Sequence, residues 1–333
     1  MTPIGLQQFC TACILMLLTG CTHLQPTPIN PRTLATSPDP IYPATQPTPG
    51  DHFRTALVIV LENQDYDDAI ANPLLKKWAD RGALLGDFQA LYHPSYHNYL
   101  ALIAGQGFAA PGGKGDQQID VPASIPTIGD ELNSWRNYAE NYPPKNCRHR
   151  EGILCLDAGG GRYARRHVPF ISFIRDRSAH PDWIVGVDPK DPDNAFFRDA
   201  QADALPQYAF YSPNLDDDGH DPVIDPVVGL KKGAVWLDGF LTRFSQTPAA
   251  RNTLVIVTYD ESRGHNDPNH IYAVLIGPMI RPGTVLAGPE HRYNHFNILR
   301  TIEDNFHVAP LAAADRAAKP IEGVWMEANG MTN

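Results

Sequence analysis

The first twenty residues of this 333-residue chain contain no aspartate, glutamate, lysine or arginine. Their apolar run, residues 14–18, is far shorter than the roughly 20 residues that a helix needs to cross a bilayer. An uncharged, apolar N-terminal stretch of this kind is typical of an export signal and not of a membrane-spanning helix. We therefore expect residues 1–20 to be a signal peptide.

The end of that stretch, Leu18-Thr-Gly-Cys21, resembles the bacterial lipobox, in which the cysteine is lipidated and becomes the new N-terminus. The resemblance implies a lipid anchor on Cys21. Because Thr22 is not aspartate, it also implies sorting to the outer membrane, with the protein facing the periplasm. The alternative is an ordinary signal peptide that is removed without lipidation.

Apolar side chains are few in residues 21–52. Eight prolines and six threonines lie between residues 22 and 50, and such a composition buries too little surface to offset the entropy of ordering. We expect an extended tether between the lipid and a folded domain. Further along there is no second Pro-rich break and no internal repeat, so residues 53–333 should form one domain.

Cysteine is scarce, with five in the chain. Cys10 and Cys13 belong to the signal peptide and Cys21 takes the lipid, which leaves Cys147 and Cys155 for the domain. In an exported protein these two are expected to pair as a disulfide. A zinc hairpin is the alternative, but the domain has no second cysteine pair to complete one.

Basic residues are outnumbered, because 27 lysines and arginines face 37 aspartates and glutamates and give a formal net charge of −10. This balance argues against nucleic-acid binding and against a polybasic membrane surface. Any membrane contact should therefore be made by the N-terminal lipid alone. An acidic protein can still act on an anionic substrate if some of its carboxylates hold cations.

Apolar periodicity indicates an α/β fold. Apolar runs, several of them rich in β-branched residues, predict strands at residues 55–61, 208–211, 253–259 and 271–276. A further strand is expected at residues 84–91, after the first predicted helix. Apolar residues at helical spacing predict helices around residues 74–79, 99–104 and 298–306. Because strands and helices alternate, we expect a mostly parallel sheet with helices on both faces.

Polar side chains follow the ends of two predicted strands. Glu62 and Asn63 come directly after residues 55–61, and Asp260 and Glu261 come directly after residues 253–259. In open α/β sheets, ligands bind at the edge formed by the carboxyl ends of the strands. Carboxylate and amide oxygens at that edge are suitable ligands for a divalent cation.

A third polar segment follows residues 208–211. Asp216 and His220 are spaced Asp-x-x-x-His, which can turn a carboxylate and an imidazole onto one cation. The alternative is that the run of three aspartates is simply solvated. His295 lies just before the predicted helix at residues 298–306 and is a further candidate ligand.

A serine precedes the predicted helix at residues 99–104. At a helix N-terminus, free backbone NH groups and the helix dipole favour a bound phosphate and lower the cost of a serine alkoxide. Ser95 is therefore a candidate nucleophile. The alternative is that Ser95 is only an N-cap, which local sequence alone favours.

Taken together, these segments resemble the bacterial phosphoesterase family of acid phosphatases and phospholipases C, within the alkaline phosphatase superfamily. The resemblance covers most of residues 53–306. It includes Trp135-Arg-Asn-Tyr-Ala-Glu140 and Arg166-His-Val-Pro-Phe170, with Val168 where the family has asparagine.

The resemblance implies an alkaline-phosphatase-like fold, a phosphoserine formed on Ser95, and Asn98 or His167 as donors to the anion. It also implies two groups of metal ligands. The group on the side of the nucleophile consists of Glu62, Asn63, Asp260 and Glu261. The second group consists of Asp216, His220 and His295. One or two divalent cations would bind there. The oxygen-rich first group suits Mg²⁺, Mn²⁺ or Ca²⁺ at least as well as Zn²⁺. His167 could equally be a core histidine.

The function that follows is metal-dependent hydrolysis of phosphate monoesters on a small phosphorylated substrate. A phosphodiesterase or phospholipase C acting on phospholipid is the nearest alternative. Sulfate hydrolysis is disfavoured, since sulfatases need Cys/Ser-x-Pro-x-Arg and Ser95 is followed by His97 and Tyr99 at those places. An alternative from another class is a lipid-anchored binding protein without turnover.

Overall fold

The computed structural model describes residues 50–108, 118–222, 225–264 and 268–327. The expected signal peptide, Cys21 and nearly all of the expected tether lie outside these ranges. Within them, no helix has both the length and the apolar character that crossing a membrane requires.

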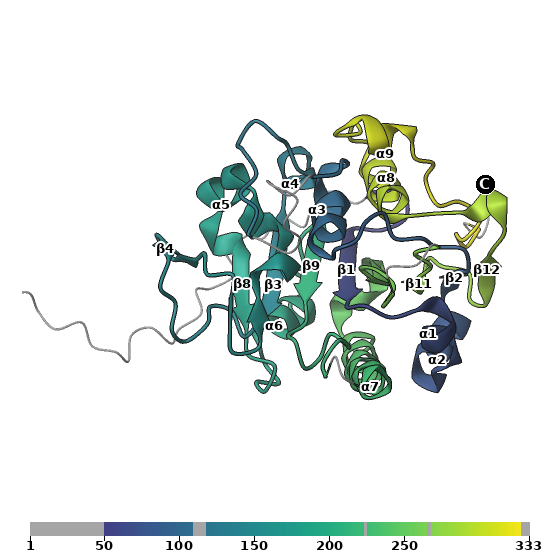
Figure 1. The fold of residues 1–333 in the computed structure, drawn as a ribbon. Helices are drawn as coiled ribbons and strands as arrows, with labels where there is room; N and C mark the ends of the chain where they lie inside the picture. Colours follow the sequence, from purple (N-terminus) through teal and green to yellow (C-terminus); the bar gives the residue numbers. More distant parts are fainter. Residues whose placement is uncertain (1–49, 109–117, 223–224, 265–267, 328–333) are drawn as a thin grey trace, which may run out of the picture. The chain divides into compact units, whose positions relative to one another are not determined.

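An eight-stranded sheet forms the centre of the domain (Figure 1). Every neighbouring pair of strands is parallel except the two pairs that include β11. In spatial order, the strands are β12 Thr284–Leu286, β2 Ala83–Leu85, β11 Ala273–Ile276, β10 Thr253–Tyr259, β1 Thr55–Leu61, β9 Tyr208–Ser212, β3 Trp135–Glu140 and β8 Ile184–Val187.

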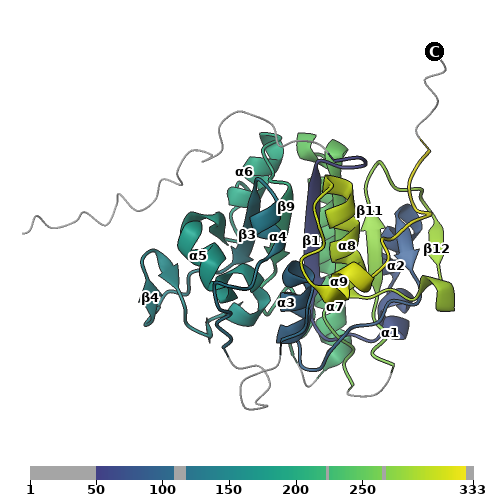
Figure 2. The ribbon, with the colours of Figure 1, turned by 90° about the horizontal axis from the view of Figure 1, so that it is seen from above.

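Helices cover both faces of the sheet, as Figures 1 and 2 show. On one face lie α3 Tyr96–Ala104, α4 Ile128–Glu131, α5 Ile174–Ala179, α8 His295–Phe306 and α9 Ala313–Ala317. On the other face lie α1 Tyr66–Ala71, α2 Pro73–Arg81, α6 Ala195–Gln201 and α7 Pro226–Phe244. The mostly parallel sheet with helices on both faces is thus confirmed.

Shorter elements connect these layers. The hairpins are β4 Arg150–Glu151 with β5 Leu154–Cys155, and β6 Gly159–Gly160 with β7 Tyr163–Ala164. Short 3-10 helices are η3 Arg165–His167, η4 Pro169–Ser172, η5 Pro181–Trp183, η6 Pro248–Asn252 and η7 Pro289–His291. Cys147 and Cys155 are disulfide-bonded across the first hairpin, which confirms the expected pairing.

The two central strands are where the sequence predicted them. All seven residues of β1 and all seven of β10 are buried, as a strand covered on both faces requires. They pair in parallel from Thr55 opposite Thr253 to Leu61 opposite Tyr259. The residues that follow the two strands therefore leave the sheet side by side at the same edge.

The strand predicted at residues 84–91 is wrong in length. β2 ends at Leu85, because a turn at Gly86 and Asp87 takes the chain off the ladder. Beyond the turn, Phe88 and Gln89 make only isolated bridges, to Tyr293 and His270. The polar segment that leads to Ser95 is therefore a loop along the sheet edge and not the end of a long strand.

Candidate active site

The site begins where β1 and β10 end. The ladder continues one step beyond each strand, since Glu62 N donates to Asp218 O at 2.8 Å and Asp260 N donates to Leu61 O at 2.9 Å. Asn63 has a left-handed backbone (φ 48°), and its N donates to Asp260 Oδ1 at 2.9 Å. Three segments far apart in the sequence thus meet at one sheet edge.

Ser95 stands at the N-cap position of α3 but does not cap it. Its backbone is helical (φ −39°, ψ −51°), and its side chain makes no hydrogen bond to the first turn. Instead, Ser95 Oγ donates to Glu261 Oε1 at 2.9 Å, and the other oxygen of Glu261 lies 2.6 Å from His93 Nδ1. Ser95 and Glu261 are both buried. The capping alternative therefore does not describe this serine.

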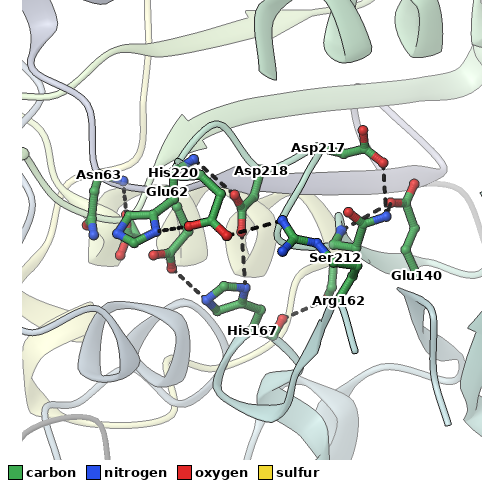
Figure 3. Close-up of polar contacts among 12 residues, drawn as sticks. Glu62, Asn63, Glu140, Arg162, His167, Ser212, Asp217, Asp218 and His220 are labelled. Carbon is green, nitrogen blue, oxygen red and sulfur yellow. Dashed lines mark hydrogen bonds and ion pairs between the residues drawn. The ribbon is translucent and has the colours of Figure 1, made fainter. Parts of the chain in front are cut away.

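His167 lies against Glu62 and not in an apolar core (Figure 3). Its Nε2 is 2.8 Å from Glu62 Oε1, and its Nδ1 is 3.7 Å from Asp218 Oδ2. Tyr99 also donates to Glu62 Oε1, at 3.1 Å, and its ring stacks on the imidazole with centroids 5.0 Å apart. The imidazole is thus held between two carboxyls and an aromatic ring.

The run of aspartates turns a different residue inward from the one expected. Asp216 has a side chain that is 52% exposed, and it pairs with Arg162 at 2.7 Å. Asp218 is fully buried beside His167 and Glu62. The aspartate in this cluster is therefore Asp218 and not Asp216, because only Asp218 is buried against His167, while Asp216 pairs with Arg162. The run of three aspartates in the sequence indicated a candidate ligand segment, but it did not show which of the three is buried.

The two expected histidine ligands differ in exposure. His220 is partly exposed; its backbone N donates to Asp218 Oδ1 at 3.0 Å, and its Nδ1 lies 3.2 Å from Asp221 Oδ1. His295 is fully buried at the start of α8, with Nε2 3.4 Å from Tyr259 O. Burial lowers the pKa of His295 to about 4, so its imidazole is neutral at ordinary pH.

Asn98 is occupied by the backbone of its own segment. Its Oδ1 accepts from Leu91 N at 3.1 Å and from Tyr92 N at 3.0 Å, while its Nδ2 donates to Tyr92 O at 2.8 Å. Asn98 has no exposed surface. These bonds fix the loop ahead of Ser95. The donation from Asn98 to an anion that the resemblance implied stays a prediction.

The buried carboxyls affect one another's charge. Burial raises the pKa of Glu62, but the charge and hydrogen bond of His167, with Arg166 and His220, outweigh it and bring the pKa to about 2. Burial and the neighbouring Glu62 charge raise the pKa of Asp218 and of Asp260 well above their usual value. One ionised carboxyl and two carboxyls with raised pKa values therefore act on one another, and such a group of buried carboxyls attracts positive charge.

Several buried ligand atoms in this region have no hydrogen-bond partner among the described residues. They are Glu62 Oε2, Asn63 Oδ1, Asp218 Oδ2, Asp260 Oδ2 and His295 Nδ1. Buried polar atoms are normally satisfied, so such a group needs an explanation. Four oxygens and one imidazole nitrogen match the donors of an oxygen-preferring divalent cation, and the residues fit such a group.

These side chains are not drawn tightly together. In the described part of the chain, the only three His, Cys, Asp or Glu ligand atoms within 4.8 Å of one another belong to Cys147, Cys155 and Asp157. That group is not a metal site, because its two sulfurs are bonded to each other. The fit of the candidate site to a cation therefore rests on its donor chemistry and its unpartnered atoms.

The fold is that of the alkaline phosphatase superfamily. A superfamily protein from Vibrio parahaemolyticus superposes with a TM-score of 0.54 at 14% identity, covering 84% of this chain and 75% of the other. Phosphonate monoester hydrolase from Silicibacter pomeroyi superposes with a TM-score of 0.52 at 12% identity, covering 80% and 75%. At such identities the likeness concerns the fold alone.

Within that fold class, the chain belongs to the phosphoesterase family, whose model matches residues 64–309. It is 30% identical to a probable acid phosphatase from Kluyveromyces lactis over 289 residues, which are 85% of this chain and 65% of that protein. It is 30% identical to phosphatidylinositol-3-phosphatase from Mycobacterium tuberculosis, covering 82% and 83%. Membership places the chain among hydrolases that act on phosphoric ester bonds.

Proposed function

We propose that this protein is a metal-dependent phosphoesterase that hydrolyses phosphate monoesters through a phosphoserine on Ser95. The observation that carries the proposal is the Ser95 side chain, which leaves its capping position to donate to Glu261. A hydroxyl paired with a buried carboxylate, itself in contact with a histidine, has the arrangement of an activated nucleophile.

The cation would be held by the buried oxygens that make no hydrogen bond, on Glu62, Asn63, Asp218 and Asp260, with His220 or His295 supplying nitrogen. When bound, the cation supplies positive charge that lowers the pKa of the Ser95 hydroxyl and polarises the phosphoryl oxygens. This donor set suits Mg²⁺, Mn²⁺ or Ca²⁺ at least as well as Zn²⁺, with one or two ions bound.

The side chains then divide the proton transfers. Ser95 Oγ attacks phosphorus as its proton passes to Glu261 Oε1, and the alcohol departs with a proton from protonated His93. Because Glu261 and His93 are in contact, the proton that Glu261 took from Ser95 can pass to His93 and replace the proton that His93 gave to the alcohol. Water next attacks the phosphoserine and releases phosphate, and the proton of that water restores the Ser95 hydroxyl.

The names of relatives support a phosphorylated substrate. Proteins called acid phosphatase and phosphatidylinositol-3-phosphatase are among the similar proteins, and both names describe release of phosphate from a monoester. The active site lies on a chain whose N-terminus we propose to be lipidated at Cys21, which would hold the enzyme at the periplasmic face of the outer membrane. Phospholipid in that membrane is the second substrate class to test.

The test is turnover of three esters by the purified protein after metal removal and reloading. We expect nitrophenyl phosphate to be hydrolysed, and hydrolysis to need the added cation. Faster hydrolysis of bis-nitrophenyl phosphate or phosphatidylcholine would instead assign a phosphodiesterase or phospholipase C. No turnover of any ester with any of the four cations would favour a non-catalytic binding protein.

A further inference from the structure

A cavity lies beside the candidate active site. It has a volume of about 570 Å³ and is formed by the loop after β2, by residues 268–270 ahead of β11, and by Arg292. β2 points the same way as β1 and β10, while β11 runs against them, so both segments emerge at the sheet edge that carries Ser95. Cavities of a few hundred Å³ are the size of small-molecule sites.

His93 connects the cavity to the nucleophile. It lines the cavity, and its Nδ1 is 2.6 Å from the carboxylate that accepts the Ser95 hydrogen bond. A group bound in the cavity would therefore lie one side chain away from the reacting centre. The cavity is therefore positioned to hold the alcohol part of the substrate, to which the phosphate is esterified.

Polar side chains on the cavity wall are held by hydrogen bonds and by a ring contact. Asn269 Oδ1 accepts from Ser262 N, and its Nδ2 donates to Tyr92 O. The ring of His270 stacks on that of Tyr66, with centroids 4.1 Å apart. Next to them, Gln89 forms an isolated bridge with His270, and Asp87 accepts from Gln89 Nε2 at 3.3 Å and from Arg292 Nε at 3.3 Å. These contacts present an amide, a carboxylate and a guanidinium to the cavity as a connected group.

The chemistry of that group selects for hydroxyls. Each hydroxyl both donates and accepts, and Asp87, Gln89 and Arg292 together offer acceptors and donors. The charge of Arg292 is matched by Asp87, so a second phosphate would gain little there. An acyl chain would cover these polar groups without hydrogen-bonding to them, and removing them from water in this way is unfavourable.

A second cavity provides a contrast. It has a volume of about 340 Å³ and lies at the opposite edge of the sheet, at the start of β10 and the end of β11. Its lining includes Trp78, Leu241 and Phe244 along with Arg251. It has no contact with His93 or Glu261 that would connect it to the chemistry.

We propose that the cavity beside His93 binds the alcohol part of the substrate, and that this part is a small polyhydroxylated group such as a sugar. Gln89 and Arg292 are the specificity-determining residues. The inference rests on the proposed phosphomonoesterase function and names the substrate class of that same site. It concerns binding, so it should show in KM more than in kcat.

The experiment compares two esters that share the phosphate and differ in the alcohol. Glucose 6-phosphate is the hydroxylated ester, and nitrophenyl phosphate is the reference because its ring has no hydroxyls. In Gln89→Leu and in Arg292→Ala, we expect KM for glucose 6-phosphate to rise about tenfold, and kcat/KM for nitrophenyl phosphate to change by less than about threefold. Arg251→Ala, in the other cavity, is the matched control and should change neither.

Each outcome decides a separate question. If the wild type hydrolyses neither ester, the proposed function fails. If it hydrolyses nitrophenyl phosphate and both variants change the two esters equally, or neither ester, the cavity inference fails while the function stands. A wild-type preference for a bisphosphate or for phosphatidic acid over glucose 6-phosphate would also overturn the inference, since an anion or an acyl chain would then be what the cavity recognises.

Discussion

At Ser95, a catalytic role and a structural role lead to different expected effects of mutation. Its side chain donates to Glu261 and leaves the first turn of α3 uncapped, so its removal takes away no cap. We expect Ser95→Ala to lower kcat by at least about a thousandfold, because the covalent route is lost. Its melting temperature should stay close to that of the wild type.

Acid quenching during turnover provides the direct check on this serine. Labelled phosphate should remain attached to the wild type and be absent from Ser95→Ala. A variant that loses stability but keeps its rate would show a structural role instead. Wild-type protein that traps no phosphate while turning over would indicate direct attack by water on phosphorus.

Asp216 and Asp218 form a matched pair for testing the cation site. Asp218 is buried beside Glu62 and His167, whereas Asp216 is half-exposed and pairs with Arg162. Asp218→Asn should lower bound metal and cost about a hundredfold in kcat/KM, since it removes a charge that a cation needs. Asp216→Asn should cost less than about threefold, because an exposed ion pair contributes little. Equal losses in the two variants would contradict this division.

At the scale of elements, the β4–β5 hairpin is held by Cys147–Cys155, which closes a loop of eight positions. A loop this short restricts the unfolded chain by about 2–3 kcal/mol. Replacing both cysteines by serine should lower the free energy of unfolding by that amount, measured by urea denaturation. Reduction of the wild type should match it, and two free thiols in periplasmic protein would contradict the pairing.

The loop before α3 shows how one element supports another. Asn98, inside the helix, accepts from Leu91 N and Tyr92 N and thereby fixes the chain that carries His93. β2 stops at Leu85, and this released chain forms both the approach to Ser95 and one wall of the 570 Å³ cavity. A long strand at residues 84–91 would have left no such wall.

At the scale of the whole molecule, a buried acid on α8 makes stability depend on pH. Burial, and then the hydrogen bond and charge of Asp315, raise the pKa of Glu303 from 4.5 to about 9. The folded protein therefore keeps a proton that the unfolded chain loses above pH 4.5, so this contribution is complete below pH 4.5 and decreases as pH rises toward 9.

We expect the free energy of unfolding to fall between pH 5 and pH 9, at no more than about 1.4 kcal/mol per pH unit for this one group. Urea denaturation across that range should show a shallower slope in Glu303→Gln. Glu322→Gln, at an exposed position nearby in the sequence, is the control and should keep the wild-type slope. An unchanged slope in Glu303→Gln would show that this acid is ionised in the folded protein.

The proposed lipid anchor also concerns the whole molecule. Labelled palmitate should enter the wild type and not Cys21→Ala, and only the wild type should fractionate with the outer membrane. Labelling of Cys21→Ala, or none in the wild type, would contradict the anchor. A processed and unlabelled protein would indicate an ordinary signal peptide.

The sequence by itself determined the framework. Continuous β-branched apolar runs are stable only when both faces are covered, so β1 and β10 could be placed to the residue, and the candidate ligands after them followed. Two lone cysteines in an expected exported domain were enough to predict their pairing. Such features depend on composition and on local periodicity, which the linear chain contains.

Only the tertiary structure decided which side chains face one another. Ser95 and Glu261 are 166 positions apart, and Asn63 and Asp260 are 197 apart, so no local pattern could show that they bond. The same is true of Asp218, which is distinguished from Asp216 only by the carboxyl and imidazole that surround it after folding. Local sequence fixes the strand and its period, but the orientation of a loop side chain depends on contacts that form when distant segments meet.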